Sequence, residues 1–375
     1  MSRWPAFLLV FGIGLVLLGV GAQNVGAASM NGKRAILDET FQFWTTPEAA
    51  DRTLSRIKEA GFNVYIPVVW YGAGATWPSA RAPWDANLSV QAAAGVDPLR
   101  YVIEKAHSMG IEVHPWFTVA LQQANALPEF ALQGQLEGGK LAIFDLHNPR
   151  FRAFIVDLIA EVVSTYDVDG INLDYIRMMG LCTNEACTRE YRERYGRNLA
   201  LDAAVFRVTP SLVPTLIDYQ ESTVTGLVRD IAERIRALKP KIVISADVHP
   251  ELTDYWQGQN SVEWANRGYV DVLFRMDYAK TIDIASTDAV RKKLNNPDGM
   301  TVLMGNYDLT PNGAQPRSGQ WLVESMTDVA ARWPRSGAAV YLYNQLSEDQ
   351  IVSLLRWNAR RAKEAPRSPL GLRVE

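Results

Sequence analysis

Cysteine and histidine are scarce in this chain, with two and four copies in 375 residues. So few thiols and imidazoles give little support to a structural zinc centre, and no His-Glu-x-x-His motif occurs. The Gly-x-Ser-x-Gly elbow of the serine hydrolases is also missing. No Gly-rich nucleotide turn follows the first expected strand, which argues against a doubly wound dinucleotide fold. We expect no metal and no organic cofactor.

Positive charge is not concentrated anywhere in the sequence. The formal net charge is -3, with an isoelectric point near 5.9, and no basic stripe is present. A nucleic-acid partner is therefore not expected. Aromatic residues are plentiful instead, with 11 Trp and 14 Tyr. Flat apolar rings fill cores, and they also pack on the faces of sugars.

Long apolar runs are confined to the N-terminus. Arg3 precedes an almost wholly apolar stretch, Ala6–Ala22, and small residues follow it. This pattern predicts a secretory signal peptide over residues 1–29. The alternative is an uncleaved anchor, because the run has about the shortest length that spans a bilayer. We therefore expect an exported protein, which is periplasmic, secreted or on the cell surface, and which touches a membrane only if the segment is uncleaved.

The two cysteines, Cys182 and Cys187, lie five residues apart. In an exported chain such a pair predicts one disulfide bond. Two free thiols, or half of a metal site, are the alternatives.

A repeated order of apolar strand, loop and amphipathic helix runs from residue 33 to residue 362. Its strands are continuously apolar, which is typical of a parallel sheet covered by helices. Eight such units predict a single-domain α/β fold, a closed (β/α)8 TIM barrel with long loop insertions, of which the longest spans about residues 177–215. Residues 363–375 are expected to form a loose tail. The eight strands are expected at about 35–37, 63–70, 111–117, 171–173, 241–246, 270–274, 301–304 and 338–342.

Acids and aromatics follow the strands at their carboxyl ends, where barrel enzymes keep their chemistry. The fourth strand ends on Asp174, and we expect this carboxylate to be catalytic because burying it without a purpose or a partner is costly. Sugar-cleaving enzymes use two carboxyls. The second acid is expected from another strand, with Asp277 as first choice and Asp247 as second. The expected substrate-binding residues are Trp70, His114, Trp116, Tyr175, Arg177, His249, Tyr278, Tyr307, Tyr343 and Asn344.

Other polar residues have structural explanations. Asp169, before a glycine, is expected to turn the chain into the fourth strand, and His107 suits the negative end of a helix. A metal hydrolase built on His114, Asp174, Asp247 and His249 stays a weaker alternative because their spacing matches no zinc motif.

Several stretches together resemble the bacterial glycosyl-hydrolase-like family 10. They are Gly61–Trp70, Trp77–Ser79, Asp97–Leu99, Ala106–Phe117, Asp145–Pro149, Tyr166–Arg177, Asp271–Tyr278 and Gly337–Tyr343. The resemblance implies an exported TIM-barrel glycosidase that acts on a cell-wall or exopolysaccharide glycan. By position it implies Asp174 as the catalytic candidate, His114 and Trp116 in the cleft, and Asp277 with Tyr278 at the end of the sixth strand.

The sequence departs from related patterns next to Asp174. Many members of that family carry two adjacent acids there, whereas this chain has Tyr175 in the second position. The segment also resembles, more distantly, the strand-four motif of family 18 chitinases, whose catalytic Glu falls on Ile176 here. Substrate-assisted chitin hydrolysis is therefore not expected. The chain is predicted to hydrolyse an extracytoplasmic polysaccharide with two carboxylates, or else to bind carbohydrate without cutting it.

Overall fold

The computed structural model describes residues 30–136, 142–249 and 257–364. The predicted signal peptide (1–29) and most of the predicted tail (363–375) lie outside these residues. Within them, no helix has both the length and the apolar character needed to cross a membrane.

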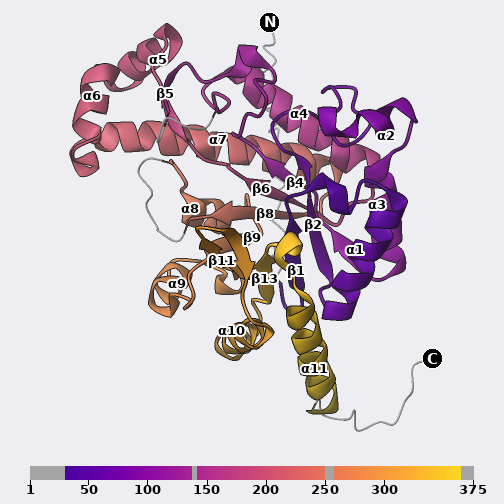
Figure 1. Cartoon of the computed structure of the whole chain (residues 1–375). Helices are drawn as coiled ribbons and strands as arrows, with labels where there is room; N and C mark the ends of the chain where they lie inside the picture. Colours follow the sequence, from indigo (N-terminus) through magenta and orange to yellow (C-terminus); the bar gives the residue numbers. More distant parts are fainter. Residues whose placement is uncertain (1–29, 137–141, 250–256, 365–375) are drawn as a thin grey trace, which may run out of the picture.

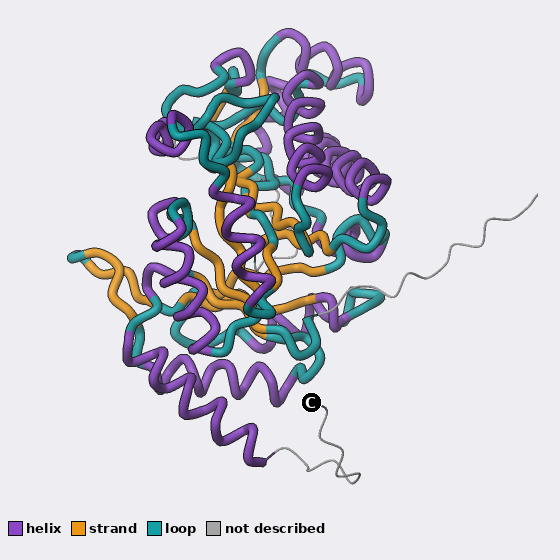
Figure 2. Tube along the Cα trace, turned by 90° about the vertical axis from the view of Figure 1, so that its right-hand side faces the viewer, coloured by secondary structure: helices purple, strands orange, loops and turns teal. Residues whose placement is uncertain are grey.

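Eight parallel strands form a closed barrel, as predicted, because the first strand pairs with both the second and the last. Figure 1 shows the strands at the centre, and the tube view of Figure 2 shows helices around them. In order around the wall the strands are β1 (Arg34–Asp38), β2 (Val64–Trp70), β4 (Trp116–Thr118), β6 (Gly170–Asp174), β8 (Val243–Val248), β9 (Val272–Asp277), β10 (Met300–Gly305) and β13 (Ala338–Tyr341).

The third predicted strand is interrupted. Its first part, β3 (Glu112–Val113), and its second part, β4, both pair with β2 and are separated by His114 and Pro115. Proline has no backbone N–H to donate, which accounts for a break in the ladder at this point. Two small antiparallel pairs lie outside the wall: β5 (Gly134–Leu136) with β7 (Gly180–Cys182), and β11 (Tyr307–Thr310) with β12 (Gly313–Pro316).

Helices connect successive strands, and three of them start on the same local signal. Thr46, Asp97 and Asn148 each cap a helix whose next residue is proline. The capping side chain satisfies a free N–H of the first turn, and proline needs no partner there. The helices are α1 (Pro47–Ala60), α2 (Ser89–Ala93), α3 (Pro98–Ser108), α4 (Pro149–Thr165), α5 (Glu185–Tyr195), α6 (Leu199–Phe206), α7 (Pro214–Leu238), α8 (Ser261–Asn266), α9 (Ile284–Arg291), α10 (Gly319–Arg332) and α11 (Glu348–Glu364).

The long insertion has a small core of its own. Helices α5 and α6 and the start of α7 extend beyond the barrel in Figure 1. Cys182 and Cys187 form the predicted disulfide bond there. Their side chains pack with Tyr191, Phe206 and Tyr219 in a cluster separate from the main core.

The barrel wall has two apolar layers, and strand residues alternate between them. The large cluster under the helices contains Ile171 and Leu173 of β6 and Ile244 and Ala246 of β8. The smaller cluster fills the barrel interior, with Leu37, Ile66, Val68, Trp116, Phe274 and Leu303 among its members. Because these residues of β6 and β8 face the helices, the residues that alternate with them along the two strands point into the barrel.

Candidate active site

Asp174 and Asp247 end the inward-facing rows of two neighbouring strands. Leu173 pairs with Ala246 in the ladder, so the residues that follow them, Asp174 and Asp247, lie side by side. Neighbouring strands lie about 4.7–4.9 Å apart. Asp174 is 7% exposed and Asp247 is 1% exposed, so both carboxyls are largely withdrawn from water.

Both carboxyls bind protons more tightly than usual. Burial raises the pKa of Asp247 well above its ordinary value, and the nearby Asp174 carboxyl raises it further. Burial also raises the pKa of Asp174, but the positive charge of Arg177 and a hydrogen bond from the Tyr175 backbone N–H act against this. The pair is therefore arranged to carry one negative charge and one proton.

Hydrogen bonds fix each member of the pair differently. Asn172, two residues before Asp174 on β6, donates from Nδ2 to Asp247 Oδ1 at 3.0 Å and lies 3.2 Å from Ser245 Oγ. Asp174 accepts the N–H of Tyr175 at 2.6 Å. Tyr175 has a φ of 47°, a left-handed conformation that is uncommon for a bulky residue and often marks a functional site.

Arg177 lies beside the acidic pair. Its guanidinium sits over the Tyr175 ring, 4.5 Å from the ring centre. The buried Nε and NH1 atoms make no hydrogen bond to any described residue. Burial of His249, together with the positive charge of Arg177, lowers the pKa of this imidazole to about 4, so it is neutral near pH 7. Arg177 thus offers unused donors at the mouth of the barrel.

A set of aromatic rings borders the other side of the mouth. Tyr341 ends β13, stacks on Tyr278 with ring centres 5.0 Å apart, and lies 6.1 Å from Tyr307 and 6.4 Å from Trp116. Its hydroxyl donates to Glu39 Oε2 at 2.6 Å. Tyr278 keeps 40% of its surface exposed.

Sequence reasoning missed Tyr341 and assigned no role to Glu39. Both lie on the inward-facing parity of their strands, Tyr341 two residues after the interior Ala339 and Glu39 two after the interior Leu37. The alternation of inward-facing and outward-facing residues along each strand could therefore have identified both side chains from the sequence.

Asp277, the first choice for the second acid, does not lie in the mouth. Its neighbours Val272 and Phe274 face the interior and Leu273 faces the helices. Asp277 therefore points outward, where it forms an ion pair with Arg275 at 3.0 Å and accepts the N–H of Asp283 at 2.9 Å. The alternation of the strand thus gives Asp277 a structural contact, and the acid that lies beside Asp174 is Asp247.

Trp70 and His114 are also outside the mouth, contrary to expectation. A register shift between Val68 and Trp70 turns the indole outward, where it packs on Phe144 and Phe154 at 6.5 and 5.8 Å between ring centres. His114 is 1% exposed and lies near the amino end of the wall, 3.4 Å from Glu112 Oε2.

The end of the last strand likewise differs from prediction. Tyr343, in the 3-10 turn after β13, is 6% exposed and packs on Phe43 at 5.1 Å, away from the aromatic set. Asn344 is exposed in that turn and shares none of the contacts that join the mouth residues. The structure thus brings together Asp174, Asp247, Trp116, Tyr175, Arg177, His249, Tyr278 and Tyr307, and excludes Asp277, Trp70, His114, Tyr343 and Asn344.

Metal-ligand atoms do not gather at the mouth. Over the described part of the chain, one group of three suitable side chains occurs, formed by Asp145, Cys182 and Cys187, and the disulfide bond already occupies both sulfur atoms. His114, Asp174, Asp247 and His249 form no such group there, so this geometry gives the metal hydrolase no support.

The closed parallel barrel, with carboxyls and aromatics at one end, defines the class of glycosidase-type TIM barrels. Solved structures share the fold at low identity. A β-galactosidase of Halorubrum lacusprofundi matches with a TM-score of 0.61 at 12% identity, covering 88% of this chain and 58% of that one. The catalytic domain of a Paenibacillus polymyxa β-amylase matches with a TM-score of 0.58 at 11% identity, covering 88% and 98%.

Residues 37–296 match the family Glycosyl hydrolase-like 10, and the chain belongs to this family. Similar curated proteins are glycosyl hydrolase YngK of Bacillus subtilis, 28% identical over 51% of this chain and 38% of its own length, and glycosyl hydrolase DigH of Escherichia coli K12, 24% identical over 50% and 44%. The matches thus span less than half of those relatives. They support a glycosidase-type function.

Proposed function

We propose that this protein hydrolyses a glycosidic bond in an extracytoplasmic polysaccharide, with Asp174 and Asp247 as the two catalytic carboxyls. The observation that carries the proposal is the pair itself. Two buried aspartates face each other from neighbouring strands at the mouth of the barrel, and each raises the cost of ionising the other. Arg177 is the cation that lowers the pKa of both, and burial outweighs it at each.

The surroundings of the two carboxyls indicate which one acts as the acid and which as the nucleophile or base. Asp247 has the more strongly raised pKa, so it holds its proton more tightly than Asp174 does, which suits a general acid. Asp174 is stabilised as an anion by Arg177 and the Tyr175 N–H, which suits a nucleophile or base. Asn172 would hold Asp247 in position.

Strand spacing favours one stereochemical course. Retaining glycosidases place their carboxyls about 5–5.5 Å apart, whereas inverting enzymes need about 6.5–9.5 Å for an intervening water. Paired residues of neighbouring strands, about 4.7–4.9 Å apart, fit the shorter separation. We infer a retaining reaction, in which Asp174 attacks the anomeric carbon and Asp247 protonates the departing oxygen.

The aromatic set and Arg177 would bind the sugar. Tyr278 and Tyr307 present rings on which a sugar face can pack, and Tyr341 and Trp116 support them from below. The unused N–H groups of Arg177 would donate to substrate oxygens. Export of the chain is supported by its disulfide bond, since such bonds persist in oxidising compartments.

The test is incubation of the purified chain with a panel of cell-wall and exopolysaccharide glycans. We expect products from at least one glycan, and a loss of about 10³-fold or more in rate in both Asp174→Asn and Asp247→Asn, because removing either member disables the pair. Asp328→Asn, an exposed substitution of the same chemistry on α10, is the matched control and should keep full activity.

Two results would contradict the proposal. Products that persist in Asp247→Asn would show that another group supplies the proton. Binding of glycans without products from any of them would identify the chain as a non-catalytic carbohydrate-binding barrel.

A further inference from the structure

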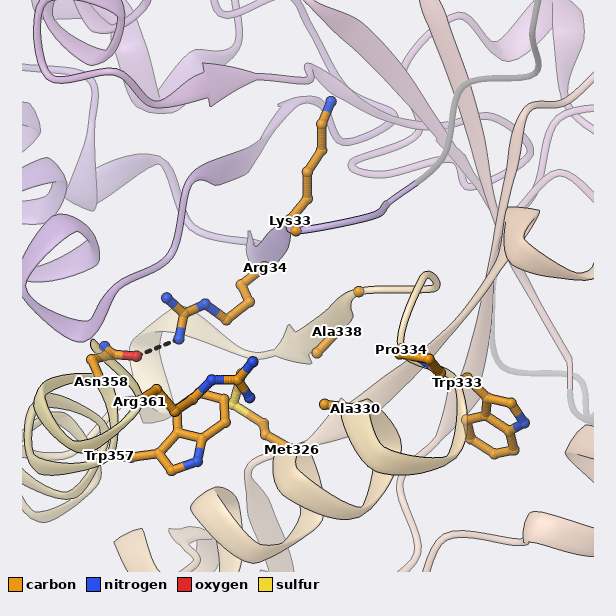
Figure 3. A pocket seen from close by; sticks show the side chains of 12 residues that line it. Lys33, Arg34, Met326, Ala330, Trp333, Pro334, Ala338, Trp357, Asn358 and Arg361 are labelled. Carbon is orange, nitrogen blue, oxygen red and sulfur yellow. Dashed lines mark hydrogen bonds between the residues drawn. The ribbon is translucent and has the colours of Figure 1, made fainter. Parts of the chain in front are cut away.

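A cavity lies at the opposite end of the barrel from the acidic pair. It occupies about 280 Å³ beside the amino ends of β1 and β13, between α10 and α11. By volume it would hold about nine waters. Figure 3 shows its lining, which includes Arg34, Met326, Trp357 and Arg361. Among the residues that line it there are three cations and no carboxylate.

Two of the three cations are brought together by one indole ring. The guanidinium carbons of Arg34 and Arg361 lie 5.3 and 4.8 Å from the ring centre of Trp357. In Figure 3 both side chains lie close to Trp357, with the Arg34 head turned toward Asn358. Lys33 points away from them and forms an ion pair with Glu112 at 2.7 Å.

Neither guanidinium has an acidic partner within 4.0 Å in the described residues. Arg34 donates to the neutral side chain of Asn358 at 2.5 Å, and Arg361 makes no ion pair there. Burial and the charge of Arg361 both lower the pKa of Arg34. Two like charges that face one cavity, with no counter-charge among the described residues, oppose each other, and an anion between them would reverse that effect.

The local backbone keeps this arrangement open. Gly61 has a φ of 82°, and a Cβ atom added there would lie 2.9 Å from Arg34 NH2. A side chain at this position would displace the guanidinium from Asn358. Glycine thus supplies both the left-handed helix end and the space that Arg34 occupies.

We propose that this cavity binds a phosphate-bearing ligand, held by the forks of Arg34 and Arg361. Two guanidiniums balance the charge of about -1.5 to -2 on a phosphate monoester, and their planar donors match its oxygens. A single carboxylate would balance only one of them. The cavity has room for a phosphate together with part of the molecule that carries it.

The test measures binding of methyl phosphate to the full chain by calorimetry at constant ionic strength. We expect Arg361→Gln to weaken the affinity at least tenfold, and Arg361→Lys to weaken it less because the charge remains. Arg360→Gln removes the same charge from a neighbouring exposed position and should change the affinity by less than twofold. Affinity should also fall from pH 7.5 to pH 5, because the phosphate gains a proton near pH 6.

Vesicles that contain phosphatidic acid, whose headgroup is a phosphate monoester, distinguish a lipid source from a soluble one. Binding to vesicles that is lost in Arg361→Gln but kept in Arg360→Gln supports a headgroup phosphate, and the same pattern with methyl phosphate supports a soluble ligand. Absence of binding to both probes, or equal binding by wild type and Arg361→Gln, would overturn the proposal.

Discussion

Asp247 and Asp277 end neighbouring strands of the barrel and face opposite sides of its wall. Asp247 points inward beside Asp174, and Asp277 points outward to Arg275. The sequence could not separate them, because β9 begins with three consecutive apolar residues, which do not show which of its faces points inward. Only the packing of Val272 and Phe274 inside the barrel reveals the parity.

This difference predicts opposite phenotypes at the residue scale. Asp277→Asn removes one member of an ion pair whose side chains are 1% and 6% exposed, and leaves Arg275 buried without its carboxylate. We expect a loss of about 3–5 kcal/mol in the free energy of unfolding. Urea denaturation measures it, and kcat per folded molecule should stay within about threefold of wild type. A stable but inactive Asp277→Asn variant would restore Asp277 as the catalytic acid.

At the scale of elements, most of the barrel was predictable. All eight strands are where the sequence predicted them, with ends moved by a few residues. The misplaced side chains trace to irregular points: the register shift at Trp70, the break at His114–Pro115, and the 3-10 turn at Tyr343. Such points depend on tertiary contacts, so the pattern of apolar residues does not signal them.

The insertion should unfold separately from the barrel, because its core is separate. Replacing Cys182 and Cys187 with serine removes a short covalent loop worth about 2 kcal/mol by loop entropy. We expect faster tryptic cleavage within α5, which contains Arg189, Arg192 and Arg194, and little change in the denaturation midpoint of the barrel. Unchanged cleavage of the insertion would contradict this view.

At the scale of the whole molecule, buried titrating groups make stability depend on pH. Burial raises the pKa of Asp38 to about 7 and that of Asp145 to about 6, so the folded state holds these protons more tightly than the unfolded chain. Their stabilisation is complete at low pH and is lost as pH rises through those values. Burial lowers the pKa of His147 to about 3 and of His249 to about 4, so stability is also lost as pH falls below about 6.5.

From pH 6.5 to pH 8 we expect Asp38 to lose about 1 kcal/mol of stabilisation, which the two histidines largely offset. Denaturation of wild type and Asp38→Asn at both pH values isolates the Asp38 contribution, because the difference in stability between the two proteins should change by about 1 kcal/mol. A difference that does not change with pH would show that Asp38 does not hold its proton as described.

The central claim is that Asp174 and Asp247 share one charge at the mouth of the barrel. Carbon-13 NMR titration of labelled aspartate carboxyls tests it without knowledge of the sugar. We predict that Asp247 titrates well above the ordinary value of about 3.9, and that Asp174→Asn lowers its pKa because a like charge is removed. Asp328→Asn should leave the titration of Asp247 unchanged. An Asp247 that titrates near its ordinary value, or that does not respond to Asp174→Asn, would contradict the account.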